Sequence, residues 1–449
     1  MSTVTEHATP PVETLRQVMR PLTGDRADFD ALLGAIGSAR LVLIGEASHG
    51  THEFYRIRAE ITKRLIAEHG FNAVAAEADW PDAYRVNRYV RGIGDDSDAA
   101  ESLGGFVRFP RWMWRNADVL DFVGWLREHN DHQADDRTRA GFYGLDLYSM
   151  HASIDAVLRF LDGVDPDAAA RARARYSCFD RFGEDLQAYG YATTLGLTPS
   201  CEADVLAQLI ELRRSAGEYT RADHRASPDD AFYAEQNARL VANAERYYRA
   251  MFGGHVDSWN LRDSHMVDTL DALLAFLGRR LATPRVVVWA HNSHLGDARA
   301  TERTRVGEHN VGQLVRERHG GEAFLVGFST YTGTVTAARD WDEPAERKRV
   351  RPALPQSYET LFHEAGVPNG LVLMRDETAR DALQHPRLQR AIGVVYRPET
   401  ERQSHYYHAH LPTQFDALLH YDVTRAVEPL ERTARWEHGD APETYPSAL

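Results

Sequence analysis

Glutamate and histidine side chains follow directly after the first short apolar run of this 449-residue chain. Residues Leu41 to Ile44 predict a strand that is buried on both faces, and Gly45 ends it. Glu46 and His49 come next, just before a helix begins. Burying ionisable groups at such a position is costly for folding, whereas ligands of open α/β sheets bind at the carboxyl ends of strands. A histidine held by a carboxylate can take a proton from water, so the pair predicts hydrolytic chemistry.

Three later apolar runs also end on ionisable side chains. In chain order these are Glu77 and Asp79 at the end of the strand predicted over residues 71–78, Asp146 at the end of residues 139–146, and His291 and His294 after residues 285–290. The alternation of strands and helices predicts parallel strands, whose carboxyl ends share one edge of a sheet. We therefore expect all four groups to meet in one cleft, with Asp79, Asp146 and His294 placed to contact a substrate.

Arg58 stands on the apolar stripe of the helix that follows the first strand, predicted over residues 51–69. It comes four residues after Phe54 and three before Ile61. An arginine on an inward face needs a charged partner. Either its side chain snorkels to solvent, or it reaches Glu46, another buried carboxylate or the substrate.

Two further stretches are candidates for the wall of the cleft. Residues 92–114 are rich in loop-forming and aromatic residues, and their interleaved arginines suit a packed loop as well as a substrate-binding wall. Trp112 is the candidate substrate contact there. In residues 404–412, His405 is a candidate cleft-lining residue. His408 and His410 are more typical of a loop rim, because such spacing carries a high false-positive risk.

The cluster leaves two kinds of hydrolysis open. Water activation by His49 needs no metal, and the other groups can steady an oxyanion. Alternatively, a divalent ion could bind His291 and His294 together with one of Glu46, His49 or Glu77. The spacing of the two later histidines does not by itself define a zinc enzyme. We expect no cofactor, with a divalent metal left open.

Nucleophilic catalysis is disfavoured. Ser48 lies outside the G-x-S-x-G pattern of serine hydrolases and is expected to cap a helix. Neither of the two cysteines lies in a catalytic motif. A non-catalytic small-molecule binding or stress-response protein is the third alternative, although the intact set of ionisable groups favours an enzyme.

Composition excludes several classes of protein. Hydrophobic residues make up 43% and charged residues 26%, as in ordinary globular proteins. The net charge of −14 argues against nucleic acid or an anionic membrane as the partner. No apolar run approaches the roughly 20 residues of a membrane span, and the first residues lack a signal-peptide core. With only Cys178 and Cys201, a disulfide framework is excluded and the cytoplasm is the expected compartment.

The predicted fold class is α/β, a mostly parallel central sheet flanked by helices, with a large inserted helical subdomain. Further strands are expected at 323–328, 371–375 and 392–396, and a short helix or turn at 411–421. Long helices are predicted at 150–162, 166–188, 202–222, 229–251 and 258–281. The predicted organisation is a flexible arm (1–24), a catalytic core (25–150 and 283–430), a helical subdomain or lid (151–282) and a C-terminal tail (431–449).

The combined motifs resemble the erythromycin esterase family. They are Gly45-Glu-Ala-Ser-His-Gly50 with Glu53, Phe54 and Arg58, then Glu77-Ala-Asp-Trp-Pro81, then Trp289-Ala-His-Asn-Ser-His294. The resemblance extends over about residues 30 to 430. It implies an α/β core with helical additions and the cleavage of a macrolide lactone ester by water, without a metal.

The resemblance also implies roles for particular residues. His49 matches the general base, Glu46 and Glu77 match carboxylates around it, and Arg58 and His291 match residues that activity requires. The stretches 401–405 and 411–421 resemble a branch of the family without a proven link to antibiotic resistance. We therefore expect a small-molecule ester or lactone as the substrate, with a macrolide such as erythromycin as one candidate. The sequence leaves the oligomeric state open.

Overall fold

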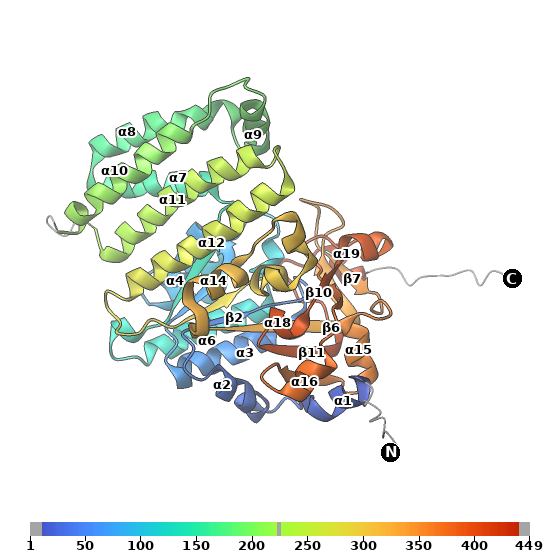
Figure 1. Cartoon of the computed structure of the whole chain (residues 1–449). Helices are drawn as coiled ribbons and strands as arrows, with labels where there is room; N and C mark the ends of the chain where they lie inside the picture. Colours follow the sequence, from blue (N-terminus) through green and yellow to red (C-terminus); the bar gives the residue numbers. More distant parts are fainter. Residues whose placement is uncertain (1–10, 222–225, 440–449) are drawn as a thin grey trace, which may run out of the picture.

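A computed structural model describes residues 11–221 and 226–439, and a nine-stranded sheet forms its centre (Figure 1). The strand order is β1-β8-β11-β6-β2-β5-β3-β4, with β7 paired to β6. The strands are β1 (Arg20–Pro21), β2 (Leu41–Ile44), β3 (Ala73–Asp79), β4 (Gly141–Asp146), β5 (Val286–Trp289), β6 (Ala323–Ala337), β7 (Glu346–Val350), β8 (Asn369–Leu373) and β11 (Ala417–Thr424). A separate two-stranded sheet joins β9 (Arg387–Arg390) to β10 (Tyr406–Ala409).

Most of the strands in the large sheet run parallel. The pairs β11–β6, β6–β2, β2–β5, β5–β3 and β3–β4 are all parallel, whereas β1, β7 and β8 pair antiparallel. The predicted fold class is confirmed. The four strands that were expected to end on ionisable groups, β2, β5, β3 and β4, are also direct neighbours.

Side chains of these strands alternate between two apolar layers. Val42 and Ile44 pack with one layer, while Leu41 and Leu43 pack with the other. This explains why the strand sequences are continuously apolar, as is typical of parallel sheets covered on both faces. The first layer is completed by α2 (Asp30–Ile36), α3 (His52–His69) and α6 (Ala117–Asp131), and the second by α1 (Pro11–Val18), α12 (His255–Leu277), α14 (Val311–His319), α15 (Tyr358–Ala365) and α16 (Glu377–Ala382).

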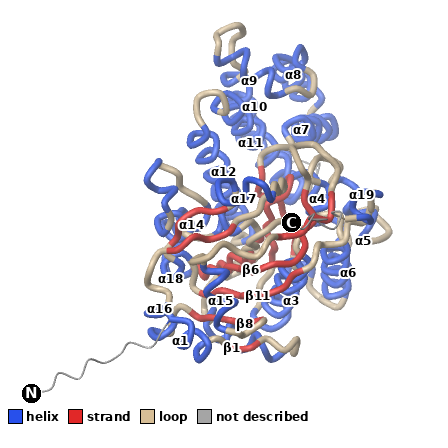
Figure 2. The backbone as a smooth tube through the Cα atoms, turned by 90° about the vertical axis from the view of Figure 1, so that its right-hand side faces the viewer, coloured by secondary structure: helices blue, strands red, loops and turns tan. Residues whose placement is uncertain are grey.

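A long helical insertion separates β4 from β5. Its helices are α7 (Met150–Val164), α8 (Pro166–Tyr176), α9 (Leu186–Thr194), α10 (Glu202–Arg221), α11 (Pro228–Ala250) and α12. Figure 2 shows α7 to α11 together at one end of the molecule, beyond the strands. The single helix predicted over 166–188 is wrong. A 3₁₀ segment (Ser177–Phe182) and Gly183, with a φ of 53°, interrupt it between α8 and α9.

The two cysteines lie within this insertion. The structure joins Cys178 and Cys201 in a disulfide, with their Cα atoms 6.0 Å apart. The count of two cysteines excluded a framework of several disulfides, but it did not predict that these two would form a single disulfide. It ties the 3₁₀ segment to the residue just before α10.

Both ends of the described chain are better ordered than the sequence predicted. Residues 11–24 are not a flexible arm, because Leu15 on α1 is fully buried and β1 pairs with β8. In the C-terminal tail, Trp436 on α19 (Ala434–His438) is buried against the sheet. Its indole Nε1–H donates to Thr336 Oγ1 at 2.8 Å. The arm and tail residues 1–10 and 440–449 lie outside the described residues.

The C-terminal part of the sheet differs most from the prediction. No strand forms at 392–396, where only single bridges link Ile392 to Ser48 and Val395 to Ala338. The stretch 411–421 divides into a short helix, α18 (Leu411–Gln414), and the start of β11, a strand inside the sheet.

The remaining helices are α4 (Trp80–Val90), α5 (Ala99–Ser102), α13 (Asn292–Leu295) and α17 (Glu401–Ser404). Within residues 11–221 and 226–439, none of the helices is both long and apolar enough for a bilayer span.

Candidate active site

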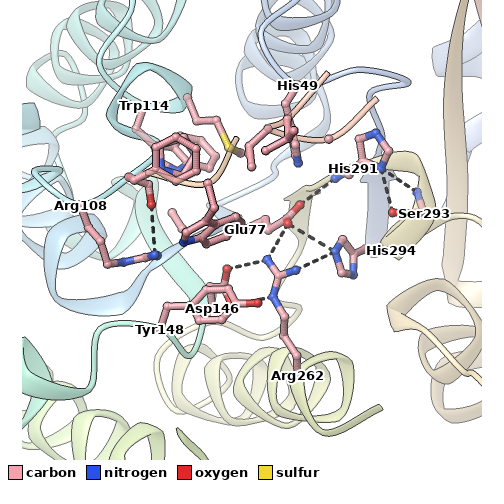
Figure 3. A pocket seen from close by; sticks show the side chains of 18 of the residues that line it. His49, Glu77, Arg108, Trp114, Asp146, Tyr148, Arg262, His291, Ser293 and His294 are labelled. Carbon is pink, nitrogen blue, oxygen red and sulfur yellow. Dashed lines mark hydrogen bonds and ion pairs between the residues drawn. The ribbon is translucent and has the colours of Figure 1, made fainter. Parts of the chain in front are cut away.

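A cavity of about 440 Å³ lies where β2, β5, β3 and β4 end (Figure 3). Most of the predicted site residues line it, namely His49, Glu77, Asp79, Asp146, His291, His294 and His405. The other three predicted residues, Glu46, Arg58 and Trp112, are buried and are not part of the lining. Four separate strand ends therefore deliver their ionisable side chains to one place, as expected for a mostly parallel sheet.

His49 is held by a buried carboxylate. Its Nδ1 lies 2.9 Å from Oε1 of Glu46, whose side chain is 1% exposed. Because a carboxylate accepts, Nδ1 carries the proton, and Nε2 remains as the nitrogen that can take another. The turn that places the ring is tightly packed: a Cβ on Gly50 would lie 2.1 Å from the carbonyl oxygen of Thr336. The backbone N–H of His49 also donates to Ile392 across 2.9 Å.

Ser48 does not cap the following helix. The residue before α3 is Thr51, whose side chain makes no capping bond. The Ser48 hydroxyl is fully buried and bonds to the Thr51 hydroxyl instead. The predicted capping role was wrong, because the chain makes one further turn before the helix begins.

Arg58 reaches Glu46 rather than solvent. Its side chain is 1% exposed, and Nη1 lies 3.4 Å from Oε1 of Glu46. The guanidinium is also sandwiched between Tyr55 and Trp289, at 4.6 and 4.7 Å from the ring centroids. The arginine therefore balances the charge of the carboxylate that orients His49.

Arg262 on α12 joins two of the strand-end acids. Its Nη2 donates to Glu77 at 2.7 Å, and it bonds Asp146 twice, at 3.0 and 2.7 Å. Burial raises the pKa of both carboxyls. The charges of His294 and Arg262 outweigh this at Glu77 and hold its pKa well below the ordinary value, and Arg262 likewise lowers the pKa of Asp146.

The carboxylates around His294 favour its protonated form. Burial lowers its pKa, but Asp263 and Glu77 outweigh burial and raise it to about 9. Nδ1 lies 2.8 Å from Asp263, and Nε2 lies 3.3 Å from Glu77. Nε2 is also 3.1 Å from Nη1 of Arg262, whose charge partly offsets the effect of the two acids on the pKa. Trp259 stacks on the ring at 4.5 Å with an interplanar angle of 7°, which suits an imidazolium.

His291, by contrast, is neutral. Burial, reinforced by the neighbouring His49, holds its pKa well below the ordinary value. The backbone N–H of Ser293 points at its Nδ1 at 3.2 Å, so the proton of the neutral ring is on Nε2. Its ring lies 4.8 Å from that of His49, and its backbone N–H donates to Glu77 at 2.9 Å.

Of the remaining predicted residues, Asp79 and His405 line the cavity and Trp112 does not. Asp79 accepts two bonds from Arg108, at 2.9 and 3.0 Å, and burial still raises its pKa. Burial lowers the pKa of His405 to about 4. Trp112 packs beside Gly50 instead of the cavity, and the following residues, Met113 and Trp114, line it in its place.

Sequence reasoning missed the contribution of α12. Trp259 and Arg262 line the cavity, and Asp263, which is fully buried, holds His294. A signal was present: Asp263 comes four residues after Trp259 and three before Met266 on an apolar stripe. The same pattern singled out Arg58 on α3, whereas Asp263 was not predicted.

The alternative of a divalent metal depends on how the ligating side chains are grouped. In the part of the chain that the structure describes, no three ligating side chains are grouped to hold an ion. Between Glu77 and Asp146, the positive charge is already supplied by the Arg262 guanidinium.

The raised pKa of His294 predicts a loss of stability at alkaline pH. Its folded-state pKa is about 9, against an ordinary value of about 6.5 in the unfolded chain. The stabilisation is therefore complete below pH 6.5 or so and is lost as the pH rises through about 9, a change of about 3 kcal/mol. We expect urea denaturation to show this decline between pH 6 and 10 in the wild type and a much smaller one in His294→Gln. Equal declines in both proteins would contradict the charged state of His294.

The chain is similar to known proteins in sequence and in fold. A family model described as erythromycin esterase matches residues 66–424. Erythromycin esterase type II of Escherichia coli is 21% identical over 397 residues, covering 84% of this chain and 90% of that protein.

Two solved structures share the fold at 18% identity, and each comparison covers 94% of this chain and 98% of the other. One is a Bacillus cereus protein, with a TM-score of 0.76. The other is a mutant of the erythromycin esterase EreC in its open conformation, with a TM-score of 0.65. Because the family model spans well over half of its length, the chain belongs to the erythromycin esterase family.

Proposed function

We propose that this protein hydrolyses an ester or lactone with water that His49 activates. The observation that supports this most directly is the pairing of His49 with Glu46. The pairing fixes the tautomer of the ring and leaves Nε2 free to act as a base beside the cavity. Membership of a family whose E. coli relatives are named erythromycin esterases supports the same class of reaction.

The proposed reaction starts when the oxygen of water attacks the ester carbonyl carbon. One water proton passes to Nε2 of His49, and the carbonyl oxygen becomes negatively charged. Arg262 and the imidazolium of His294 lie in the same cavity lining and stabilise that charge. The carbon–oxygen bond to the alcohol then breaks, and His49 returns its proton to the departing oxygen.

The neighbouring groups have supporting roles in this proposal. His291 stays neutral beside His49, so it adds no positive charge that would oppose protonation of the base. Glu77 accepts hydrogen bonds from Arg262 and from the backbone of His291. It therefore fixes α12 and the end of β5 relative to each other at the cavity. The insertion that was predicted as a helical subdomain or lid, residues 151–282, contributes Trp259 and Arg262 of α12 to the cavity wall.

Assays with a panel of carboxylic esters and lactones, including macrolide lactones, test the proposal. We expect turnover of some members that is unchanged after treatment with EDTA, because the charges come from arginine and histidine side chains. Loss of turnover on chelation, with recovery on adding a divalent ion, would contradict the metal-free mechanism. A panel without any turnover would favour a binding protein instead.

A further inference from the structure

The buried part of the cavity, its floor, is charged, and its exposed part, the mouth, includes an apolar group. That group is Phe109, Trp341, Val394 and Val395, and the exposed lining also includes Arg108, Arg111 and Ser404. Trp341 is 50% exposed although it also lines the cavity, so it stands at the edge. Its ring lies 5.1 Å from that of Phe109. An exposed aromatic pair at the entrance of a site offers a surface for the part of a ligand that protrudes from it.

Most charged side chains of the lining are ion-paired, and two of the cations, His294 and Arg303, are held by Asp263 and Glu308 behind the lining. The acids are Glu77, Asp79 and Asp146, and the cations are Arg108, Arg111, Arg262, Arg303 and the His294 imidazolium. All three acids are already paired with arginine: Arg262 holds two of them and Arg108 the third. An ammonium group that entered would find each lining carboxylate already paired, so the loss of its hydration would go uncompensated.

We propose that the substrate is an ester whose non-reacting body is apolar and carries no positive charge, and that Trp341 and Phe109 select it. The inference rests on the proposed hydrolytic function, since it concerns the same cavity. The ester enters the charged floor beside His49, and its body covers the Phe109–Trp341 pair at the mouth. Covering an exposed tryptophan removes apolar surface from water, and this burial favours large neutral bodies over small ones.

An isosteric pair of esters tests the charge preference. A 3,3-dimethylbutyl ester and a choline ester of the same acid have nearly the same shape and differ by one positive charge. We expect kcat/KM to be about 10-fold or more higher for the neutral ester, because the ammonium of the choline ester would lose its hydration without gaining an unpaired carboxylate. Equal rates, or a preference for the choline ester through cation–π contact with Trp341, would overturn the proposal.

The Trp341→Ala variant tests the aromatic mouth. We expect the ratio of kcat/KM for the 3,3-dimethylbutyl ester to that for the methyl ester to fall by about 10- to 100-fold, the range for lost apolar contacts in a pocket. The matched control is Phe252→Ala, an aromatic residue that is 44% exposed but lies after α11, away from the cavity. This control should leave the ratio unchanged. A ratio that is unaffected in Trp341→Ala would overturn the assignment.

Binding separates this proposal from the proposed function. The 3,3-dimethylbutyl ether and its choline-ether counterpart cannot be hydrolysed, and calorimetry measures their affinity for the wild type directly. Tighter binding of the neutral ether without turnover of any ester would leave the selectivity intact and refute the hydrolase. Ester turnover without any preference for the neutral compounds would support the hydrolase and refute the selectivity. If neither ether binds and no ester is turned over, both proposals fail.

Discussion

Replacing His49 by glutamine is expected to lower kcat for ester hydrolysis by about 10²- to 10⁴-fold, the usual contribution of a general base. Glutamine keeps a side chain of similar length and can still donate to Glu46, but it cannot take a proton from water. Steady-state assays on the best ester or lactone of the panel measure the effect. Because the fold around the turn is retained, the midpoint of thermal unfolding should change little.

The matched control for this variant is His52→Gln. His52 lies three residues further on, and its Nδ1 is held by Asp118 at 2.9 Å, so it is also a carboxylate-bound histidine. It is half-buried on α3 and does not line the cavity. We expect its replacement to leave kcat within about two-fold, as for a surface substitution away from the site. If both variants retain activity, or both lose it equally, His49 is not the base.

The strand ends that carry the candidate site were predictable because parallel sheets obey a simple rule. An apolar run of four to seven residues that stops on a charged side chain places that charge at one edge of the sheet. Glu46, Glu77, Asp146 and His291 all followed this rule. The pairing of Arg58 with Glu46 was predictable for a related reason, since a buried arginine must find an anion.

Other parts of the fold depended on contacts that no local pattern reveals. The stretch at 392–396 is rich in β-branched residues, yet it forms only single bridges, because Ile392 is used to hold the turn of His49. The residues that became β11 begin after a proline-containing helical turn, and the pairing of β11 with β6 and β8 decides its conformation.

The role of Arg262 could not be predicted from strand ends, because α12 belongs to an insertion far along the chain. Its position among its helical neighbours has no distinctive spacing. Only the folded structure shows that Glu77 and Asp146 lie together where a cation can pair with both. The site thus has two parts: the residues at the strand ends, which were predictable, and the residues of the insertion, which were not. This division makes Arg262 the residue whose loss should affect the assembled site most.

Replacing Arg262 by methionine is expected to reduce the free energy of unfolding at pH 7 by about 3–5 kcal/mol, as when one partner of a buried ion pair is removed. Methionine fills much of the same volume, so the loss reflects charge more than packing. Glu77 and Asp146 remain buried, 6% and 4% exposed, without the guanidinium that bonded both. Urea denaturation of the two proteins at the same pH measures the difference.

The pH dependence of this difference separates charge from packing. In the wild type, the lowered pKa values of Glu77 and Asp146 give stability that is present above the ordinary carboxyl pKa and lost as the pH falls. Without Arg262, burial favours the protonated forms of Glu77 and Asp146. The difference in free energy of unfolding between the wild type and Arg262→Met should therefore be smaller at pH 4 than at pH 7.

The matched control is Arg85→Met, which breaks the ion pair with Asp96 at a site where the arginine side chain is 41% exposed. Because the arginine of this pair keeps contact with solvent, the pair contributes less than the buried one, and this variant should lose much less stability at either pH. If Arg262→Met costs no more than Arg85→Met, or if its cost does not change with pH, the two acids do not depend on Arg262 for their charge. The electrostatic account of the cavity floor would then be wrong.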